Sequence, residues 1–292
     1  MISDLDSNVL YRLQKRLKEV RVPSSDFTIG SILMWGDWFD IRIKEYVNSF
    51  IFENVYQDKG KTYSVLAGED DYLEVIDYLY AQARSNNRML VLSSITENEK
   101  SRLSDHYGQR IAFDENRDWS DYVYLATDLK ELKGNKYHKK KNQVNQFIKN
   151  HSDFEFLREL DIQEAKEFIG KWAQEADKSS ALFNYESSAS ENLLRYIDQF
   201  HFCSCGLRVN GNLIGMSIGE LINDSLYVHI EKADIFYSGV YQMINREFIR
   251  HFADDRVRYV NREEDIGDEG LRKSKLSYHP DFMIKKYFAF IE

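Results

Sequence analysis

Three strand-like runs separated by two short turns constrain the fold of the second half of this 292-residue chain. The runs cover residues 201–209, 213–221 and 225–231. Asn210-Gly211 stands between the first two, and this dipeptide is a strong signal for a tight hairpin because both residues accept positive φ angles. Asn223-Asp224 marks a second turn. The pattern predicts three consecutive antiparallel strands.

Helical patterns flank these strands. Residues 161–176 form a predicted helix with Ala165, Phe168, Ile169 and Trp172 on one face, and a second helix is predicted over residues 190–200. A helix over 239–252, a strand over 257–261, a short helix and a last strand over 282–291 follow. This order is similar to that of the GNAT acyltransferase fold, so we expect an α/β protein.

The first half also mixes helices and strands. The pattern predicts a helix after Asp70 and Asp71, strands over residues 88–95 and 122–126, and a helix over 97–106 between them. The aromatic region from residue 27 to 56 is expected to add strands. We therefore predict two tandem GNAT-like halves, residues 1–128 and 129–292, with mixed, mostly antiparallel sheets flanked by helices.

The composition and charge of the chain exclude some classes of protein. The net charge of -9 disfavours a general nucleic-acid-binding protein, although a local basic patch can still act. Cys203 and Cys205 share one face of a predicted strand and are expected to be reduced core residues. No apolar run approaches the ~20 residues that span a bilayer, and the N-terminus has no signal-peptide pattern. We expect a cytoplasmic protein with no membrane span and no metal site.

A densely charged segment, Asn261–Pro280, stands between two apolar runs. Burying unpaired charge is costly, so these side chains either pair with each other or serve a ligand. Recognition of a substrate amine and a purely structural network both remain open. Calcium binding is rejected because the glycine and glutamate positions of an EF-hand loop are not met. The candidate substrate-binding residues are Asn261, Arg262, Glu263, Asp265 and Lys275.

Two further groups are candidates for chemistry. Glu231 ends the third strand of the hairpin, where it is either a general base for an attacking amine or the partner of Arg262 or Arg272 in a salt bridge. A run of basic residues, Lys136 to Lys141, is either a clamp for phosphates or a solvated helix face. Lys140 and Arg272 are the candidate phosphate ligands.

In the GNAT fold the helix after the third hairpin strand holds the diphosphate of the acyl donor at its N-terminus. Exposed N–H groups and the helix dipole attract anions at such a place. Here that place contains one glycine rather than a glycine-rich run. A tyrosine often returns a proton to the leaving thiolate in this fold, and Tyr278 is the candidate for that role. The candidate donor-binding residues are Tyr237, Ser238, Gly239, Val240 and Tyr241.

Several motifs carry a more specific resemblance. They are Asp121–Tyr124, Leu132–Asn142, His229–Ala233, Gly239–Asn245 and Asn261–Pro280. With these motifs the chain resembles the bacterial family named for the C-terminal domain of phosphatidylglycerol lysyltransferase, whose members look like tandem GNAT proteins akin to the Fem-type aminoacyltransferases. Membrane-bound relatives move an aminoacyl group from tRNA to a lipid. Many stand-alone members of this size have no established reaction.

The resemblance implies an acyltransferase or aminoacyltransferase. The expected donor is an acyl-CoA, which makes coenzyme A the expected cofactor, or an aminoacyl-tRNA. The expected acceptor is a small molecule with an amine or a hydroxyl group. Glu231 is the expected base and Tyr278 the expected acid. The alternative is a catalytically inactive GNAT-like module that binds a nucleotide or a protein, which the single glycine at the diphosphate site favours.

Overall fold

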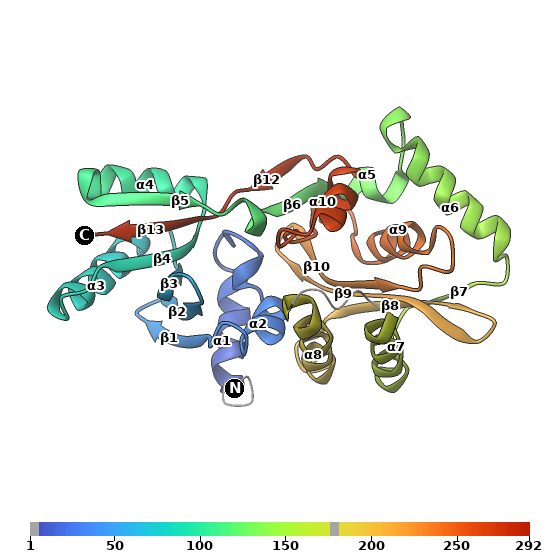
Figure 1. Ribbon diagram of the computed structural model, residues 1–292, viewed down its shortest axis with the longest axis horizontal. Coiled ribbons are helices and arrows are strands. Elements are labelled where there is room, and N and C mark those ends of the chain that lie inside the picture. Colours follow the sequence, from blue (N-terminus) through green and yellow to red (C-terminus); the bar gives the residue numbers. More distant parts are fainter. Residues whose placement is uncertain (1–5, 176–180) are drawn as a thin grey trace. The chain divides into compact units, whose positions relative to one another are not determined.

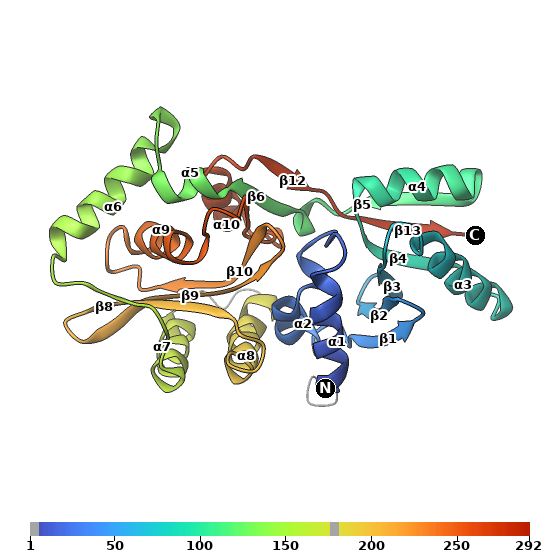
Figure 2. The same cartoon turned by 180° about the vertical axis from the view of Figure 1, so that it is seen from behind.

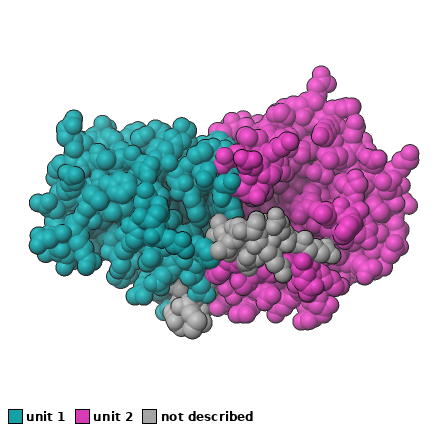
Figure 3. Space-filling view, viewed as in Figure 1, with its two compact units in different colours: residues 1–121, 264–267, 283–292 teal, residues 122–263, 268–282 magenta. Residues whose placement is uncertain are grey.

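A computed structural model describes residues 6–175 and 181–292 of the chain. The chain forms two compact units (Figure 3). Unit 1 comprises residues 1–121, 264–267 and 283–292, and unit 2 comprises residues 122–263 and 268–282. Each unit therefore contains segments that are far apart in the sequence. The division into halves at residues 128 and 129 remains a prediction about how the chain folds.

Unit 1 is built on a six-stranded mixed sheet. Its strands are β1 (Arg42–Tyr46), β2 (Ser49–Tyr56), β3 (Gly60–Leu66), β4 (Leu90–Ile95), β5 (Ile111–Glu115) and β13 (Tyr287–Ile291), in the spatial order β1-β2-β3-β4-β13-β5. Strands β3 and β4 run parallel, and the other neighbours run antiparallel. The helices are α1 (Ser7–Leu17), α2 (Ile29–Trp35), α3 (Tyr72–Ser85) and α4 (Glu97–Tyr107). The apolar face predicted for α3 is buried through Val75, Ile76 and Leu79.

Unit 2 is built around a seven-stranded sheet. The strands lie in the order β12 (Phe282–Ile284), β6 (Asp121–Leu125), β11 (Tyr259–Asn261), β10 (Ser225–Ala233), β9 (Asn212–Ile222), β8 (Cys203–Val209) and β7 (Glu155–Leu157). The helices are α5 (Ala126–Glu131), α6 (His138–Asn150), α7 (Ile162–Glu175), α8 (Ala181–Arg195), α9 (Val240–Phe252) and α10 (Glu269–Leu276). Helix α9 covers one face of the sheet and α7 and α8 cover the other (Figure 1), and Figure 2 shows the same layers from behind.

The predicted three-stranded antiparallel hairpin is confirmed in β8, β9 and β10. Asn210 and Gly211 have φ angles of 50° and 77°, and Asn223 in the second turn has 54°. Both Cys203 and Cys205 of β8 are free thiols, and Cys205 is buried. Burial raises the pKa of the Cys203 thiol to about 12, which makes it chemically inert at neutral pH.

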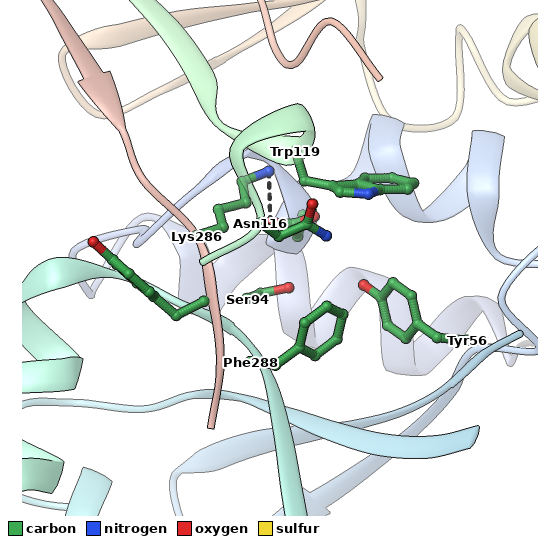
Figure 4. A pocket seen from close by; sticks show the side chains of 8 residues that line it. Tyr56, Ser94, Asn116, Trp119, Lys286 and Phe288 are labelled. Atoms are coloured by element: carbon green, nitrogen blue, oxygen red, sulfur yellow. Dashed lines mark ion pairs between the residues drawn. The ribbon is translucent and has the colours of Figure 1, made fainter. Parts of the chain in front are cut away.

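Three sequence predictions of element boundaries differ from the structure. The second predicted helix, residues 190–200, is the later part of α8, which ends at Arg195. Part of the region expected to form strands, residues 29–35, is the buried helix α2. The last strand is two strands, because Lys286 interrupts the apolar run and turns its ammonium toward Asp26 and Asp121, and Figure 4 shows its ion pair with Asp26. Strand β13 then joins the sheet of unit 1.

The centre of the sheet in unit 2 opens beside β10. Strand β10 pairs in parallel with β11 only from Ser225 to Tyr227, and a bulge at His229 shifts its register against β9. Within the described chain, residues 228–233 of β10 therefore have a strand neighbour only on the β9 side. The backbone edge left on the β11 side therefore includes Glu231, the candidate base.

Candidate functional site

A buried ion pair marks the end of β10. The Arg262 guanidinium donates from Nη2 to Oε1 of Glu231 at 2.8 Å, and the Asn245 side-chain amide in α9 donates to Oε2 at 2.7 Å. The Arg262 and Glu231 side chains are only 9% and 11% exposed. Because a second lone pair on each carboxylate oxygen remains, Glu231 can still accept another hydrogen bond. The pairing of Glu231 with Arg262 is one of the two alternatives that the sequence left open.

Two cations lie near the ring of Tyr278 in this cluster. The Lys140 ammonium lies 4.1 Å from the centre of the ring, and the Arg262 guanidinium carbon lies 4.8 Å from it. Burial, together with the charges of Arg262 and Lys139, lowers the pKa of Lys140 to about 8. Burial raises the pKa of the Tyr278 phenol, which bonds to Gln242 of α9. The phenol therefore stays protonated at neutral pH.

The cluster contains more positive than negative charge, and not all of its polar atoms are bonded. Among the described residues, Arg262 Nη1 and Asn245 Oδ1 are buried without a hydrogen-bond partner. Within the same part of the chain, Lys140 has an aromatic neighbour but no acidic partner. Buried polar groups are normally satisfied, so a buried guanidinium nitrogen without a partner indicates space for a ligand atom that accepts a hydrogen bond.

The N-terminus of α9 is fixed by a glycine. Gly239 precedes the helix with φ of 87°, and a Cβ atom there would lie 2.3 Å from the carbonyl oxygen of Gln143 in α6. Only glycine allows both this backbone angle and this close approach. The first turn of α9 leaves the N–H groups of Tyr241 and Gln242 without a backbone acceptor among the described residues. The predicted donor-binding segment thus has free N–H groups, with Tyr237 half-buried, Ser238 exposed and Val240 buried beside them.

Much of the charged segment is a structural network. The Asn261 Oδ1 atom accepts from the Glu263 N–H at 2.8 Å, and the Lys275 ammonium donates to the Arg262 carbonyl at 2.6 Å. These bonds hold the backbone on both sides of the Arg262 side chain. Arg272 lies half-buried in α10. Asp265 belongs to unit 1, where its carboxylate pairs with Arg117 at 3.2 Å.

His229 lies next to the bulge of β10 and faces two carboxylates. Its Nδ1 lies 2.7 Å from Oε1 of Glu263, and its Nε2 lies 2.9 Å from Oε1 of Glu220. Burial lowers the pKa of the imidazole, but the two carboxylates raise it by more, to about 10. His229 is therefore a buried histidine with both ring nitrogens bonded, and it holds Glu263 in place.

Sequence reasoning did not select three members of the cluster. Asn245 and Gln242 are polar positions in an otherwise apolar helix face, within a motif that was noticed for its resemblance only. Tyr124 lies 5.8 Å from the Arg262 guanidinium carbon and looked like an ordinary strand residue. The signal for Asn245 was available, because a buried amide in a helix needs a polar partner. Tyr124 belongs to the motif Asp121–Tyr124, which was noticed for its resemblance and gave no role for this side chain.

In the described part of the chain, no helix has the length and the apolar character that are needed to cross a membrane. The family described as phosphatidylglycerol lysyltransferase, C-terminal, matches residues 18–290. The chain therefore belongs to this family, and the resemblance found in the sequence motifs is confirmed.

Solved structures show the same architecture. A conserved protein of unknown function from Bacteroides thetaiotaomicron matches with a TM-score of 0.87 and 26% identity, over 99% of this chain and 98% of that chain. L-PGS from Bacillus licheniformis matches with a TM-score of 0.65 and 13% identity, over 96% and 91% of the two chains. A tandem GNAT protein from the clavulanic acid biosynthesis pathway matches with a TM-score of 0.50 and 8% identity, over 98% of this chain and 95% of that chain. The predicted α/β fold with two GNAT-like mixed sheets is confirmed.

Proposed function

We propose that the protein is an acyltransferase or aminoacyltransferase that moves an acyl group from acyl-CoA or aminoacyl-tRNA to an amine or hydroxyl acceptor. The observation that carries this proposal is the buried cluster at the end of β10, where Lys140 and Arg262 outnumber the single carboxylate of Glu231. Acyl transfer develops negative charge on the carbonyl oxygen and on the leaving group. Positive charge that is already in place and shielded from water stabilises that development strongly.

Each side chain of the cluster has a role in this proposal. Glu231 is held by Arg262 and Asn245 so that its remaining lone pairs orient the acceptor and take its proton. The unpartnered Nη1 of Arg262 donates to an oxygen of the donor. Tyr278 is protonated at neutral pH and supplies the proton for the leaving group, and Lys140, with a pKa of about 8, is the second candidate for that proton.

The backbone offers places for the donor. The edge of β10 over residues 228–233 and the N–H groups of Tyr241 and Gln242 are suited to an extended chain and to a phosphate. We assign Tyr237 to Tyr241 to the donor site, with Lys140 contributing charge. Asn261, Glu263 and Lys275 position Arg262 and the adjoining backbone. Contact of Asp265 and Arg272 with a ligand remains a prediction.

The charge of helix α6 supports one of the two proposed donors over the other. No acidic residue occurs from residue 132 to 152, although the whole chain has a net charge of -9. Lys139, Lys141 and Lys149 are exposed and have no acidic partner in the part of the chain that the structure describes. Such a surface suits the backbone of a nucleic acid and has less to contribute to coenzyme A. It therefore favours aminoacyl-tRNA over acyl-CoA as the donor.

One observation favours the alternative, a GNAT-like module that binds a ligand without reaction. The Tyr278 ring lies close to both Lys140 and Arg262, and all three side chains are buried. Among these three side chains the packing is close, and side chains that fill a cleft are what this alternative predicts. Binding without transfer is the behaviour that this alternative predicts.

Binding and transfer are measured separately. Thermal-shift titrations with coenzyme A and acetyl-CoA, with ATP as a control for phosphate binding, detect a CoA site because a ligand of the folded state raises the melting temperature. Filter binding with aminoacylated and uncharged tRNA detects an aminoacyl-tRNA site. The Lys139→Glu/Lys141→Glu variant tests whether the lysines of α6 bind the tRNA. Saturable binding of either donor, followed by loss of its acyl group to an added amine, supports the proposal. Binding without transfer supports the alternative, and no binding of either donor contradicts both.

A further inference from the structure

Strands β10 and β11 separate beside the proposed site. Among the described residues, the two strands pair only up to Tyr227, which stands opposite Asn261. The chain that continues from β11 keeps its bonds to β6, because the Arg262 N–H donates to the Tyr122 carbonyl at 3.0 Å and the Tyr122 N–H donates to the Glu263 carbonyl at 3.1 Å. Arg262 and Glu263 therefore lie beside a gap in the sheet, at the point where the backbone ladder to β10 has ended.

Two side-chain bridges cross this gap. The Arg262 guanidinium donates to the Glu231 carboxylate of β10 at 2.8 Å, and Nδ1 of His229 lies 2.7 Å from Oε1 of Glu263. The bridges thus join two consecutive residues beyond β11 to two residues of β10 that have one residue between them. Because the second bridge holds the residue next to Arg262, it also limits where the Arg262 side chain can lie.

The backbone of Glu263 needs such support. Its φ is 56°, in the left-handed region that glycine and asparagine accept more readily than glutamate does. Its N–H is bonded to Oδ1 of Asn261 at 2.8 Å, which turns the chain away from β10. Residues in this region persist only where the surrounding contacts hold them. The bond from His229 is one of those contacts.

His229 is itself firmly held on the side of β10. Its side chain is 0% exposed, and its Nε2 lies 2.9 Å from Oε1 of Glu220 in β9. The ring of Phe202 meets the imidazole edge to face at 6.0 Å between centres. A protonated imidazole can donate to two carboxylates on opposite sides of one rigid ring. The bridge therefore runs from β9 through His229 to Glu263.

We infer that His229 is a positioning residue of the site at the end of β10: through Glu263 it fixes the width of the gap between β10 and β11, and so holds the Arg262 guanidinium against Glu231. His229 acts through Arg262 and contacts neither the donor nor the acceptor. Its effect on the donor rests on the proposed function, whereas the placement of Arg262 does not. A displacement of about 1 Å within a site can cost on the order of 10²-fold in rate, so this bridge matters for transfer.

The first test observes Arg262 without any donor, in the full-length protein labelled with 15N-arginine. Arg262→Lys assigns the Nε–H signal of Arg262. Glutamine cannot donate to Glu220 and Glu263 from opposite sides, so His229→Gln should shift this signal and speed the exchange of its proton with water. Val209→Ala in β8, which β9 and β10 separate from β11, should lower the melting temperature and leave the signal in place. An Arg262 signal in His229→Gln that matches the wild type would overturn the inference.

A matched pair of variants at Glu263 tests the bridge and leaves the buried imidazole intact. Asparagine accepts a positive φ, but its side chain is one methylene too short to reach His229. Glutamine removes the same charge and keeps both the length and an acceptor oxygen. Only Glu263→Asn should move the Arg262 signal. Equal spectra of Glu263→Asn and Glu263→Gln would show that the bridge does not position Arg262.

Donor binding then connects the bridge with the proposed function. The donor that binds the wild type, acetyl-CoA or aminoacyl-tRNA, should bind about tenfold more weakly to His229→Gln and to Glu263→Asn, and with wild-type affinity to Glu263→Gln. If neither donor binds the wild type, the proposed function fails, and the Arg262 signal still decides whether His229 positions Arg262. A moved signal with unchanged affinity would support the positioning of Arg262 and place the donor elsewhere.

Discussion

Arg262 is bonded to Glu231 through one guanidinium nitrogen, at 2.8 Å, while its other terminal nitrogen is buried without a partner among the described residues. The pair alone is a structural salt bridge, but the second nitrogen is what a ligand oxygen would use. Lysine keeps the positive charge but lacks the planar guanidinium, whose two terminal nitrogens can bond to Glu231 and to a ligand at the same time. We predict that Arg262→Lys folds and binds the donor at least tenfold more weakly, as measured by titration. Wild-type affinity would mean that Arg262 is only structural.

Glu231→Gln tests the proposed base. The amide keeps an oxygen for the bond from Arg262 or Asn245, so the protein should remain folded. Without a carboxylate to take the proton, turnover should fall by about 10²–10⁴-fold. Glu247→Gln in α9 is the control, because in the described part of the chain Glu247 bonds only to arginines of its own helix. Equal turnover in wild type and Glu231→Gln would remove Glu231 from the mechanism.

The sequence predicted the hairpin and helices α7 and α9 of unit 2 well, because Asn210-Gly211 and the 3.6-residue periods are local signals. It failed where distant residues decide the structure. Lys286 divides the last apolar run because Asp26 and Asp121, far away in the sequence, surround its ammonium. For the site, Glu231 and Arg262 were selected as charged residues at strand ends, whereas the role of Asn245 depends on the packing of α9 against β10.

Gly239→Ala should destabilise the protein strongly. Alanine at a φ of 87° is strained by about 1–2 kcal/mol, and its Cβ would meet the Gln143 carbonyl at 2.3 Å. Gly211→Ala is a matched control, since Gly211 has a φ of 77° and open space around it. Denaturant unfolding should show a loss of free energy in Gly239→Ala that exceeds the loss in Gly211→Ala by about 1–3 kcal/mol. Equal losses would show that the close approach of Gln143 in α6 to Gly239 does not affect stability.

Lys140 should make stability rise with pH. Its pKa is about 8 in the folded protein and 10.5 without its environment, so the unfolded chain binds more protons between these values. The free energy of unfolding should increase from pH 8 to 10.5, by an amount on the order of a few kcal/mol. Lys140→Met should remove this increase and be more stable than wild type at pH 7. The difference between the pH dependences of the free energy of unfolding in wild type and in Lys140→Met isolates the contribution of Lys140. Identical pH dependences would contradict the lowered pKa of Lys140.

His229 should have the opposite effect. Its pKa rises from 6.5 to about 10 on folding, so its contribution to stability is fully present below pH 6.5 and is lost as the pH rises to 10. At pH 8 the imidazole should carry protons on both nitrogens. The 15N chemical shifts of the ring report this directly, and His229→Asn assigns the signals. A single protonated nitrogen at pH 8 would show that the two carboxylates do not hold an imidazolium.

The most direct measurement is the titration of Lys140 itself in protein labelled with 13C-lysine, with Lys140→Met assigning the signal. Without donor the Lys140 signal should titrate near pH 8. If the cluster at the end of β10 holds the anionic donor, saturation with acetyl-CoA or with aminoacyl-tRNA should shift this signal and raise the pKa of Lys140. An unchanged pKa with both donors bound would show that they bind elsewhere and would contradict the proposed site.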